Sequence, residues 1–170
     1  MSGISKNGTQ MNYFFNFEKL AYIKKKKTEG CILCRLRDED KSIPNTIVHR
    51  TEDTAVSLNL YPYNPGHSLI FPLRHVDDIR NLTETERFSL DAMINKVLDA
   101  LDSLYNPSGY NIGYNMGLEA GASIEHLHLH IIPRYPNELG IAELLGGKRV
   151  LVEDIDKSRE RLKKALFGIE

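Results

Sequence analysis

Apolar residues fall into five short stretches that predict the β-strands of this 170-residue chain. The stretches are rich in Val, Ile, Leu and Thr and are bounded by Pro, Gly or Asn, which is typical of strands between tight turns. They cover residues 46–48, 54–60, 67–71, 110–114 and 126–132. The last stretch begins with a strict alternation of histidine and leucine, which places the two residue types on opposite faces of a strand.

Two further segments have the spacing of amphipathic helices. Thr83 and Glu86 form a capping box, in which each side chain satisfies a free backbone N–H at the start of a helix. One apolar stripe then predicts a helix that ends near residue 105, and it comprises Leu90, Ile94, Val97, Leu98, Leu101 and then Leu104 or Tyr105. A last helix is predicted over residues 155–166. Strands on both sides of one long helix favour an α+β fold with the helix on one face of the sheet.

Charge and length limit the classes of protein to which the chain can belong. It has 22 Lys and Arg against 23 Asp and Glu, whereas an extended nucleic-acid groove needs a basic excess. No apolar run approaches the roughly 18–20 residues of a membrane span, and the first residues lack the order of a signal peptide. We therefore expect a soluble, cytoplasmic protein with one main domain and with no membrane or nucleic-acid partner.

Histidine is unevenly placed, because three of the six histidines are His126, His128 and His130. Three histidines in a row on one face are not explained well by a polar surface exposed to solvent. The two remaining interpretations are a catalytic site and a metal site made of histidines. The loop at residues 117–123, directly upstream, is rich in Gly and Ala. Such a loop brings backbone N–H groups close to an anionic oxygen, and Ser123 adds a hydroxyl donor.

The only two cysteines, Cys31 and Cys34, have the C-x2-C spacing that suits two thiolates on one tetrahedral zinc. In a cytosolic chain a metal pair is favoured over a structural disulfide. A redox pair and two packed free thiols remain the alternatives. A tetrahedral site needs two more ligands, and no second Cys or His pair with metal-binding spacing lies near these cysteines in the sequence.

The segment His126-Leu-His-Leu-His-Ile-Ile132 resembles the signature of the histidine triad (HIT) superfamily of nucleotide hydrolases and transferases. Residues 59–67, 72–76, 109–115, 120–124 and 133–134 resemble further blocks of its zinc-containing branch, which includes diadenosine tetraphosphate phosphorylases and hydrolases. The resemblance implies an antiparallel half-barrel sheet with one long helix, continued across a homodimer. It also implies an extension at residues 1–27, a HIT domain at 28–152 and a C-terminal helix at 153–170.

For the functional site, the resemblance implies a nucleotide-binding pocket and a mechanism with a covalent intermediate. The middle histidine, His128, is the expected nucleophile, and the resulting nucleotidyl-histidine is released by water or phosphate. His130 is expected to contact the phosphate oxygens and help the leaving group, with His67 behind the nucleophile. The remaining expected contacts are Asn59 on the ribose and Asn115, Gly121 and Ser123 on the phosphates.

The resemblance also completes the metal site. The implied ligands are Cys31, Cys34, His75 and His126, which would hold a structural zinc and tether the N-terminal segment to the sheet. A closed four-ligand site leaves no water on the metal. His49 lies outside every block, and we expect it on the surface.

Two departures from the family bear on the substrate. Residues 134–140 replace a Trp-containing segment that often follows the triad, and Glu125 stands where proline is frequent. We expect a hydrolase or phosphorylase of dinucleoside polyphosphates or related adenylylated compounds, and the third histidine, His130, favours hydrolysis. The alternatives are a zinc-stabilised nucleotide sensor without turnover and a deadenylase of nucleic-acid ends, which would need a basic surface.

Overall fold

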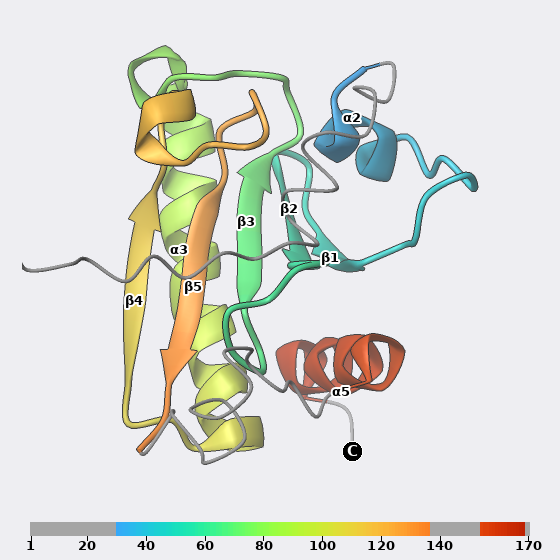
Figure 1. Ribbon diagram of the computed structural model, residues 1–170, viewed down its shortest axis with the longest axis vertical. Helices are drawn as coiled ribbons and strands as arrows, with labels where there is room; N and C mark the ends of the chain where they lie inside the picture. Colours follow the sequence, from blue (N-terminus) through green and yellow to red (C-terminus); the bar gives the residue numbers. More distant parts are fainter. Residues whose placement is uncertain (1–29, 137–153, 169–170) are drawn as a thin grey trace, which may run out of the picture.

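Five antiparallel strands form the centre of the computed structural model, which describes residues 30–136 and 154–168 (Figure 1). The sheet order is β1-β2-β3-β5-β4. The strands are β1 (Ile47–Arg50), β2 (Thr54–Leu58), β3 (Ser68–Pro72), β4 (Gly109–Tyr114) and β5 (Leu129–Arg134). All five predicted strands are confirmed, as is the α+β class. The expected extension at residues 1–27 and the boundary at residue 152 lie outside the described residues, so the domain limits stay predictions.

One long helix, α3 (Glu84–Tyr105), runs behind the sheet and covers that face (Figure 1). Its capping box has the predicted form, because Glu86 N donates to Thr83 Oγ1 and Thr83 N donates to the Glu86 carboxylate. The predicted C-terminal helix is α5 (Ile155–Phe167), capped by Asp154. The described residues also form three short helices: α2 (Ile32–Arg37), η1 (Ile79–Asn81) and η2 (Leu118–Ala120).

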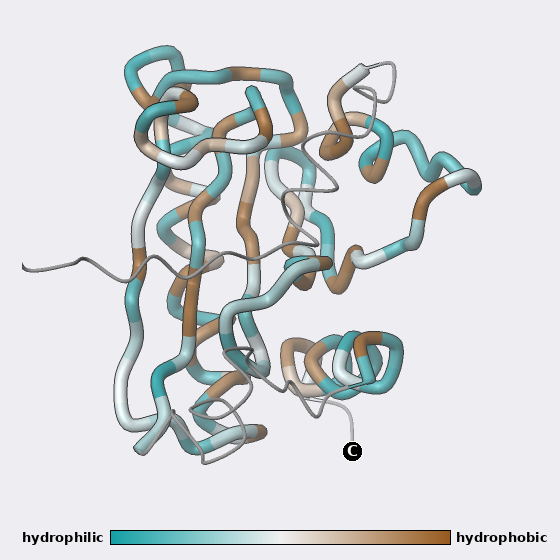
Figure 2. The backbone as a smooth tube through the Cα atoms, viewed as in Figure 1, coloured by the Kyte–Doolittle hydropathy of each residue, from teal (hydrophilic) through white to brown (hydrophobic). Residues whose placement is uncertain are grey.

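The two faces of the sheet carry separate apolar clusters. The larger lies against α3 and α5, and brown residues follow β3 and β5 there (Figure 2). Its members include Val56, Ile70, Leu101, Ile131 and Leu162. On the opposite face, Leu33 and Leu36 of α2 pack on Ala55 and Phe71, which are paired across β2 and β3. The second cluster therefore holds α2 against the face that α3 leaves open.

The histidine-rich strand differs from its prediction at both ends. β5 begins at Leu129 rather than at residue 126, because Leu127 N instead donates to Val76 O in the loop after β3. It also continues through Pro133 to Arg134. Pro133 is tolerated because its backbone faces away from β4, toward Asn64, whose amide donates to Pro133 O at 2.6 Å. A proline without an N–H therefore breaks no bond of the β4–β5 ladder.

The expectation that His49 lies on the surface needs a correction. His49 is in β1 and is half-buried, with its ring 4.8 Å from the Phe167 ring at the end of α5. Because no sequence pattern linked β1 to α5, their packing could not be predicted.

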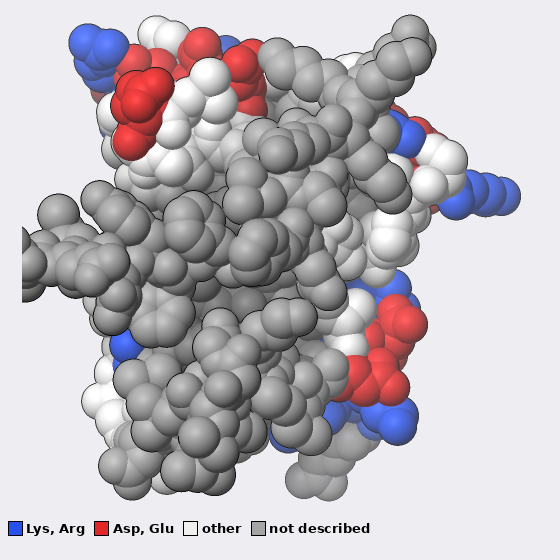
Figure 3. All heavy atoms as spheres, in the orientation of Figure 1, with Lys and Arg blue, Asp and Glu red and all other residues white. Residues whose placement is uncertain are grey.

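Charged residues of both signs lie side by side over α5 on the face that Figure 3 shows. α3 has 22 residues but carries charged side chains along its length. Over residues 30–136 and 154–168, no helix is both long and apolar enough to cross a membrane.

Replacing Gly66 with alanine tests how closely the turn before β3 packs on α3. Gly66 has φ +78°, and an added Cβ would lie 2.9 Å from Leu101 Cδ2. We expect the free energy of unfolding to fall by about 2–5 kcal/mol, from the left-handed backbone and from overpacking. Gly168→Ala is the control, because Gly168 has φ +63° with open space around it, and its loss should be about 1–2 kcal/mol. Equal losses in urea unfolding of the two variants would contradict this packing.

Candidate functional site

A row of paired residues crosses the face of the sheet opposite α3. Ser57 of β2 is paired with Leu69 of β3, Leu69 with His130 of β5, and His130 with Gly113 of β4. Directly opposite residues share a face, so these four positions form the floor of a site. Because Gly113 has no side chain, nothing on β4 covers His130 from that side.

His128 precedes β5 and is almost fully buried, with its ring 4.8 Å from the His130 ring. Its Nδ1 lies 2.6 Å from the backbone oxygen of His126. A carbonyl oxygen only accepts, so Nδ1 carries the proton and Nε2 of the neutral ring keeps its lone pair. Burial lowers the pKa of His128, which keeps the ring neutral at pH 7. This arrangement gives His128 a nucleophilic nitrogen at Nε2.

A hydrogen-bonded chain behind His128 sets the tautomer of His130. Tyr63 N donates to His67 Nδ1 at 3.1 Å, so the proton of neutral His67 lies on Nε2. His67 Nε2 then donates to His130 Nδ1 at 3.0 Å, which places the proton of neutral His130 on Nε2. His67 is buried, and its ring lies 5.2 Å from the His130 ring. His130 therefore carries a donor where His128 carries a lone pair.

A pocket of about 200 Å³ opens above His128 and His130. One end is apolar, because α2 and the segment after it supply Ile32, Leu33, Leu36, Ile43 and Pro44. The lining also includes four of the expected site residues: Asn59, Asn115, Gly121 and Ser123. Such a pocket fits a molecule that has a flat apolar ring at one end and an anionic group at the other.

The expected ribose and phosphate residues differ in how firmly they are held. Asn59 is fixed, because its Oδ1 accepts from Tyr61 N at 2.9 Å. Its amide nitrogen lies 3.3 and 3.4 Å from the two His67 ring nitrogens and so is aligned with neither lone pair. Gly121 has φ +89°, which suits glycine and lets the loop turn in front of Asn115. The Gly-rich loop therefore lines the pocket next to Asn115.

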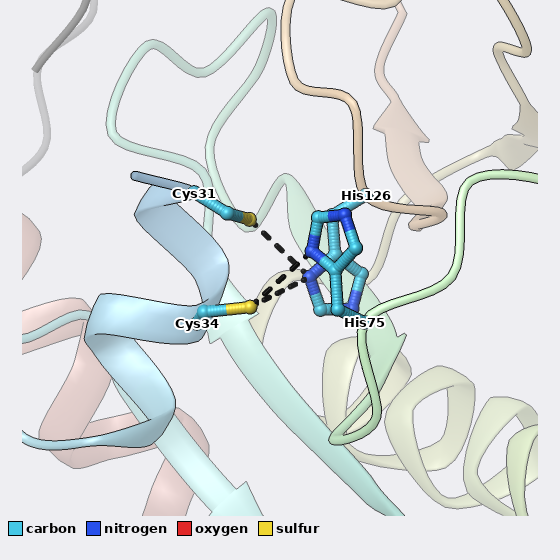
Figure 4. Close-up of side chains that lie close together, drawn as sticks. All are labelled: Cys31, Cys34, His75 and His126. Carbon is cyan, nitrogen blue, oxygen red and sulfur yellow. Dashed lines mark hydrogen bonds between the residues drawn. The ribbon is translucent and has the colours of Figure 1, made fainter. Parts of the chain in front are cut away.

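The four expected metal ligands meet at one point between α2 and the sheet (Figure 4). Cys31 is the N-cap of α2 and Cys34 lies one turn on, so both sulfurs leave the same side of the helix. Cys31 Sγ lies 3.3 Å from His126 Nδ1, and Cys34 Sγ lies 3.3 Å from His75 Nδ1. All four donor atoms are within 4.8 Å of one another.

This donor set fits a tetrahedral metal ion. Zinc bonds of about 2.0–2.3 Å put neighbouring ligand atoms roughly 3.5 Å apart, close to the separations found. His126 Nε2 donates to Pro72 O at 2.9 Å, which directs the Nδ1 lone pair at the thiols. Burial lowers the pKa of His126 to about 4 and, with Cys31, raises that of Cys34 to about 11. The cluster can hold a metal ion, whose charge would favour the thiolates.

Several residues of the site were not predicted. The helix α2 was missed because it has only six residues, although the spacing of its three apolar residues indicates one buried side. The chain Tyr63–His67–His130 could not be found from sequence, because it depends on how the turn before β3 folds back. Ser57 is the one polar residue among residues 55–58, and that contrast could have identified it.

Comparison with known proteins identifies the family of this chain. The HIT domain family matches residues 40–137, and the chain belongs to this family. A crystal structure of a zinc-bound histidine triad family protein from Mycobacterium smegmatis has the same fold, with a TM-score of 0.66. It is 24% identical in sequence, and the match covers 82% of this chain and 94% of that one.

Two curated relatives carry enzyme names. The chain is 35% identical over 129 residues to an AP-4-A phosphorylase of Mycobacterium tuberculosis, covering 75% of this chain and 64% of that protein. It is 36% identical over 92 residues to an asymmetrical bis(5'-nucleosyl)-tetraphosphatase of Schizosaccharomyces pombe, covering 54% and 50%. The chain therefore spans between half and two thirds of the length of these relatives.

Metal analysis tests the cluster directly. We expect the purified protein to hold about one zinc ion per chain, and Cys34→Ser to lose it and to unfold at a lower temperature. The measurements are elemental analysis by mass spectrometry and thermal unfolding. His49→Asn is the control, because His49 is also half-buried but lies outside the cluster. Equal zinc content in Cys34→Ser and the wild-type protein would show that these residues do not bind it.

Proposed function

We propose that the protein cleaves dinucleoside polyphosphates, or related adenylylated compounds, by transferring a nucleotidyl group to His128 and then to water or phosphate. The observation that carries this proposal is the pair of opposite tautomers at the pocket, a lone pair on His128 Nε2 beside a donor on His130 Nε2. The names of the M. tuberculosis and S. pombe relatives support the substrate class. A sensor without turnover would have no need of this pair.

The proposed chemistry proceeds in two displacements. His128 Nε2 attacks the α-phosphorus, a P–N bond forms, and the bridging P–O bond breaks. The leaving polyphosphate receives a hydrogen bond from His130 Nε2–H, which His67 holds in place. Water or phosphate then attacks the same phosphorus and displaces His128, which returns to its neutral form with the proton on Nδ1. Ser123, Gly121 and Asn115 bind the phosphate oxygens, and Asn59 binds the ribose.

The proposed metal is a structural zinc held by Cys31, Cys34, His75 and His126. The ion supplies a cross-link between α2 and the sheet when bound, and with four protein ligands it has no open position for substrate. Catalysis therefore falls to the imidazoles and the amides.

Product analysis tests the activity and identifies the acceptor. With diadenosine tetraphosphate, attack at the α-phosphorus should give AMP plus ATP from water, or ADP plus ATP when phosphate is the acceptor. His128→Ala should lower the turnover number by at least about 10³-fold, because the nucleophile is removed. The control His49→Asn should retain it. Two molecules of ADP as the products, or full activity of His128→Ala, would contradict the mechanism.

We also propose a homodimer joined through the β4 edge of the sheet. β4 is a six-residue edge strand, and Ile112 is 45% exposed although its partner Ile131 is fully buried. An apolar row that ends at the edge strand of the described sheet favours pairing with a second copy.

The dimer is tested by sedimentation velocity. Ile112→Asp should shift the protein from dimer to monomer, because a charge would be buried at the paired edge. Phe167→Asp is the control, since Phe167 is half exposed on α5, away from β4. A wild-type protein that sediments as a monomer at micromolar concentration would refute the proposal.

Finally, we propose that the protein works in the cytoplasm. Cys31 and Cys34 are free thiols in the structure, and a thiolate metal site persists best where the surroundings are reducing.

A further inference from the structure

The hydroxyl of Ser57 is a buried polar group without a hydrogen-bond partner. Among the side chains of residues 30–136 and 154–168, it is the one buried nitrogen or oxygen in this condition. Ser57 lies within β2, fully buried between Val56 and Leu58. Buried hydroxyls are almost always paired, because leaving one unpaired costs stability. A ligand that supplies the missing partner would explain why serine stands here.

The position of Ser57 indicates which part of a ligand it meets. Ser57, Leu69 and His130 lie in one row on the floor of the pocket, with β3 between β2 and β5. Two strand spacings separate Ser57 from His130 by about 9.5 Å. In a 5′-nucleotide with its phosphate at His128 and His130, that distance reaches the base and passes the ribose. Asn59, two residues after Ser57, lies nearer the ribose.

The surroundings of Ser57 are those of a base-binding site. Leu33 and Leu36 of α2 face this end of the pocket, together with Ile43 and Leu69. In an apolar pocket a few polar groups fix the orientation of the ligand, and water competes weakly for them. Thr46, also nearly buried, adds a second hydroxyl-bearing side chain to the lining of the pocket.

We propose that Ser57 Oγ is a specificity-determining residue that hydrogen-bonds to the nucleobase of the substrate. The inference rests on the proposed function and deepens it, because it identifies the nucleobase as the part of the substrate that β2 contacts. A hydroxyl donates to a ring nitrogen or accepts from an exocyclic amine. The preferred ligand is therefore a 5′-nucleotide whose base presents one of these groups toward β2, and a base of the same shape without them binds less well.

The test compares three ligands by calorimetry on the zinc-loaded protein: AMP, benzimidazole riboside 5′-phosphate and ribose 5-phosphate. The second keeps the shape of a purine but lacks the nitrogens of its six-membered ring and the exocyclic amine, and the third has no base. Ser57→Ala should weaken AMP binding by about 3- to 10-fold, the loss of one neutral hydrogen bond. The affinity of Ser57→Ala for the benzimidazole compound and for ribose 5-phosphate should equal that of the wild-type protein. Its stability to urea should be equal to or higher than that of the wild-type protein.

Ser68→Ala is the matched control. Ser68 is also fully buried, in the adjacent strand, but it faces α3 and its Oγ donates to Gly66 O at 2.9 Å. This variant should lose stability and keep the wild-type preference for AMP over the base isostere.

The outcomes separate this inference from the proposed function. If the wild-type protein prefers AMP and Ser57→Ala keeps that preference, or weakens all three ligands equally, the role of Ser57 is overturned while the nucleotide site stands. If the wild-type protein binds AMP no better than ribose 5-phosphate, the pocket does not bind a nucleobase. The role of Ser57 and the proposed cleavage of dinucleoside polyphosphates are then both overturned, because both require nucleotide binding in this pocket.

Discussion

The hydrogen bond from His128 Nδ1 to the backbone oxygen of His126, 2.6 Å long, connects the two parts of the site. It fixes the tautomer of His128, and its acceptor belongs to a residue that is itself held at both ring nitrogens. His126 Nε2 donates to Pro72 O, and its Nδ1 faces the thiols of Cys31 and Cys34. His126 therefore links the cluster of candidate metal ligands to His128, the proposed nucleophile, which lies two positions away in the chain.

The same cluster builds a wall of the pocket. A helix of six residues has almost no stability of its own, so α2 depends on what holds it. Cys31 and Cys34 hold its start, and Arg50 of β1 holds its end by donating to Leu36 O and Arg37 O at 2.7 Å. Between these anchors the apolar residues of α2 face the pocket. The four candidate metal ligands thus help to fix both the ring of His128, the proposed nucleophile, and the position of α2 beside the pocket.

Much of the fold could be predicted because its signals are local. The capping box at Thr83 and the apolar stripe after it determine α3, and the alternation after His126 places Leu127 and Leu129 in the core. The metal ligands could be chosen only through the family resemblance, since Cys34 and His126 are 92 residues apart. That choice agrees with the structure, in which the four ligand atoms converge.

What could not be predicted depends on contacts between distant segments. The partner of His128 is a backbone oxygen, which no side-chain pattern reveals, and the tautomer of His130 depends on Tyr63 N through His67. Pro133 was expected to end its strand, but its backbone faces Asn64 rather than β4, so the strand continues without the loss of a ladder bond. In each case the backbone geometry of the assembled sheet decided the outcome.

The central claim is that His128 is held neutral with its proton on Nδ1. A long-range ¹H–¹⁵N correlation spectrum of the zinc-loaded protein at pH 7 reports this directly, with His128→Asn used to assign the signals. We expect a protonated, pyrrole-type Nδ1 and an unprotonated, pyridine-type Nε2 for His128. The reverse tautomer, or a ring protonated on both nitrogens, would contradict it.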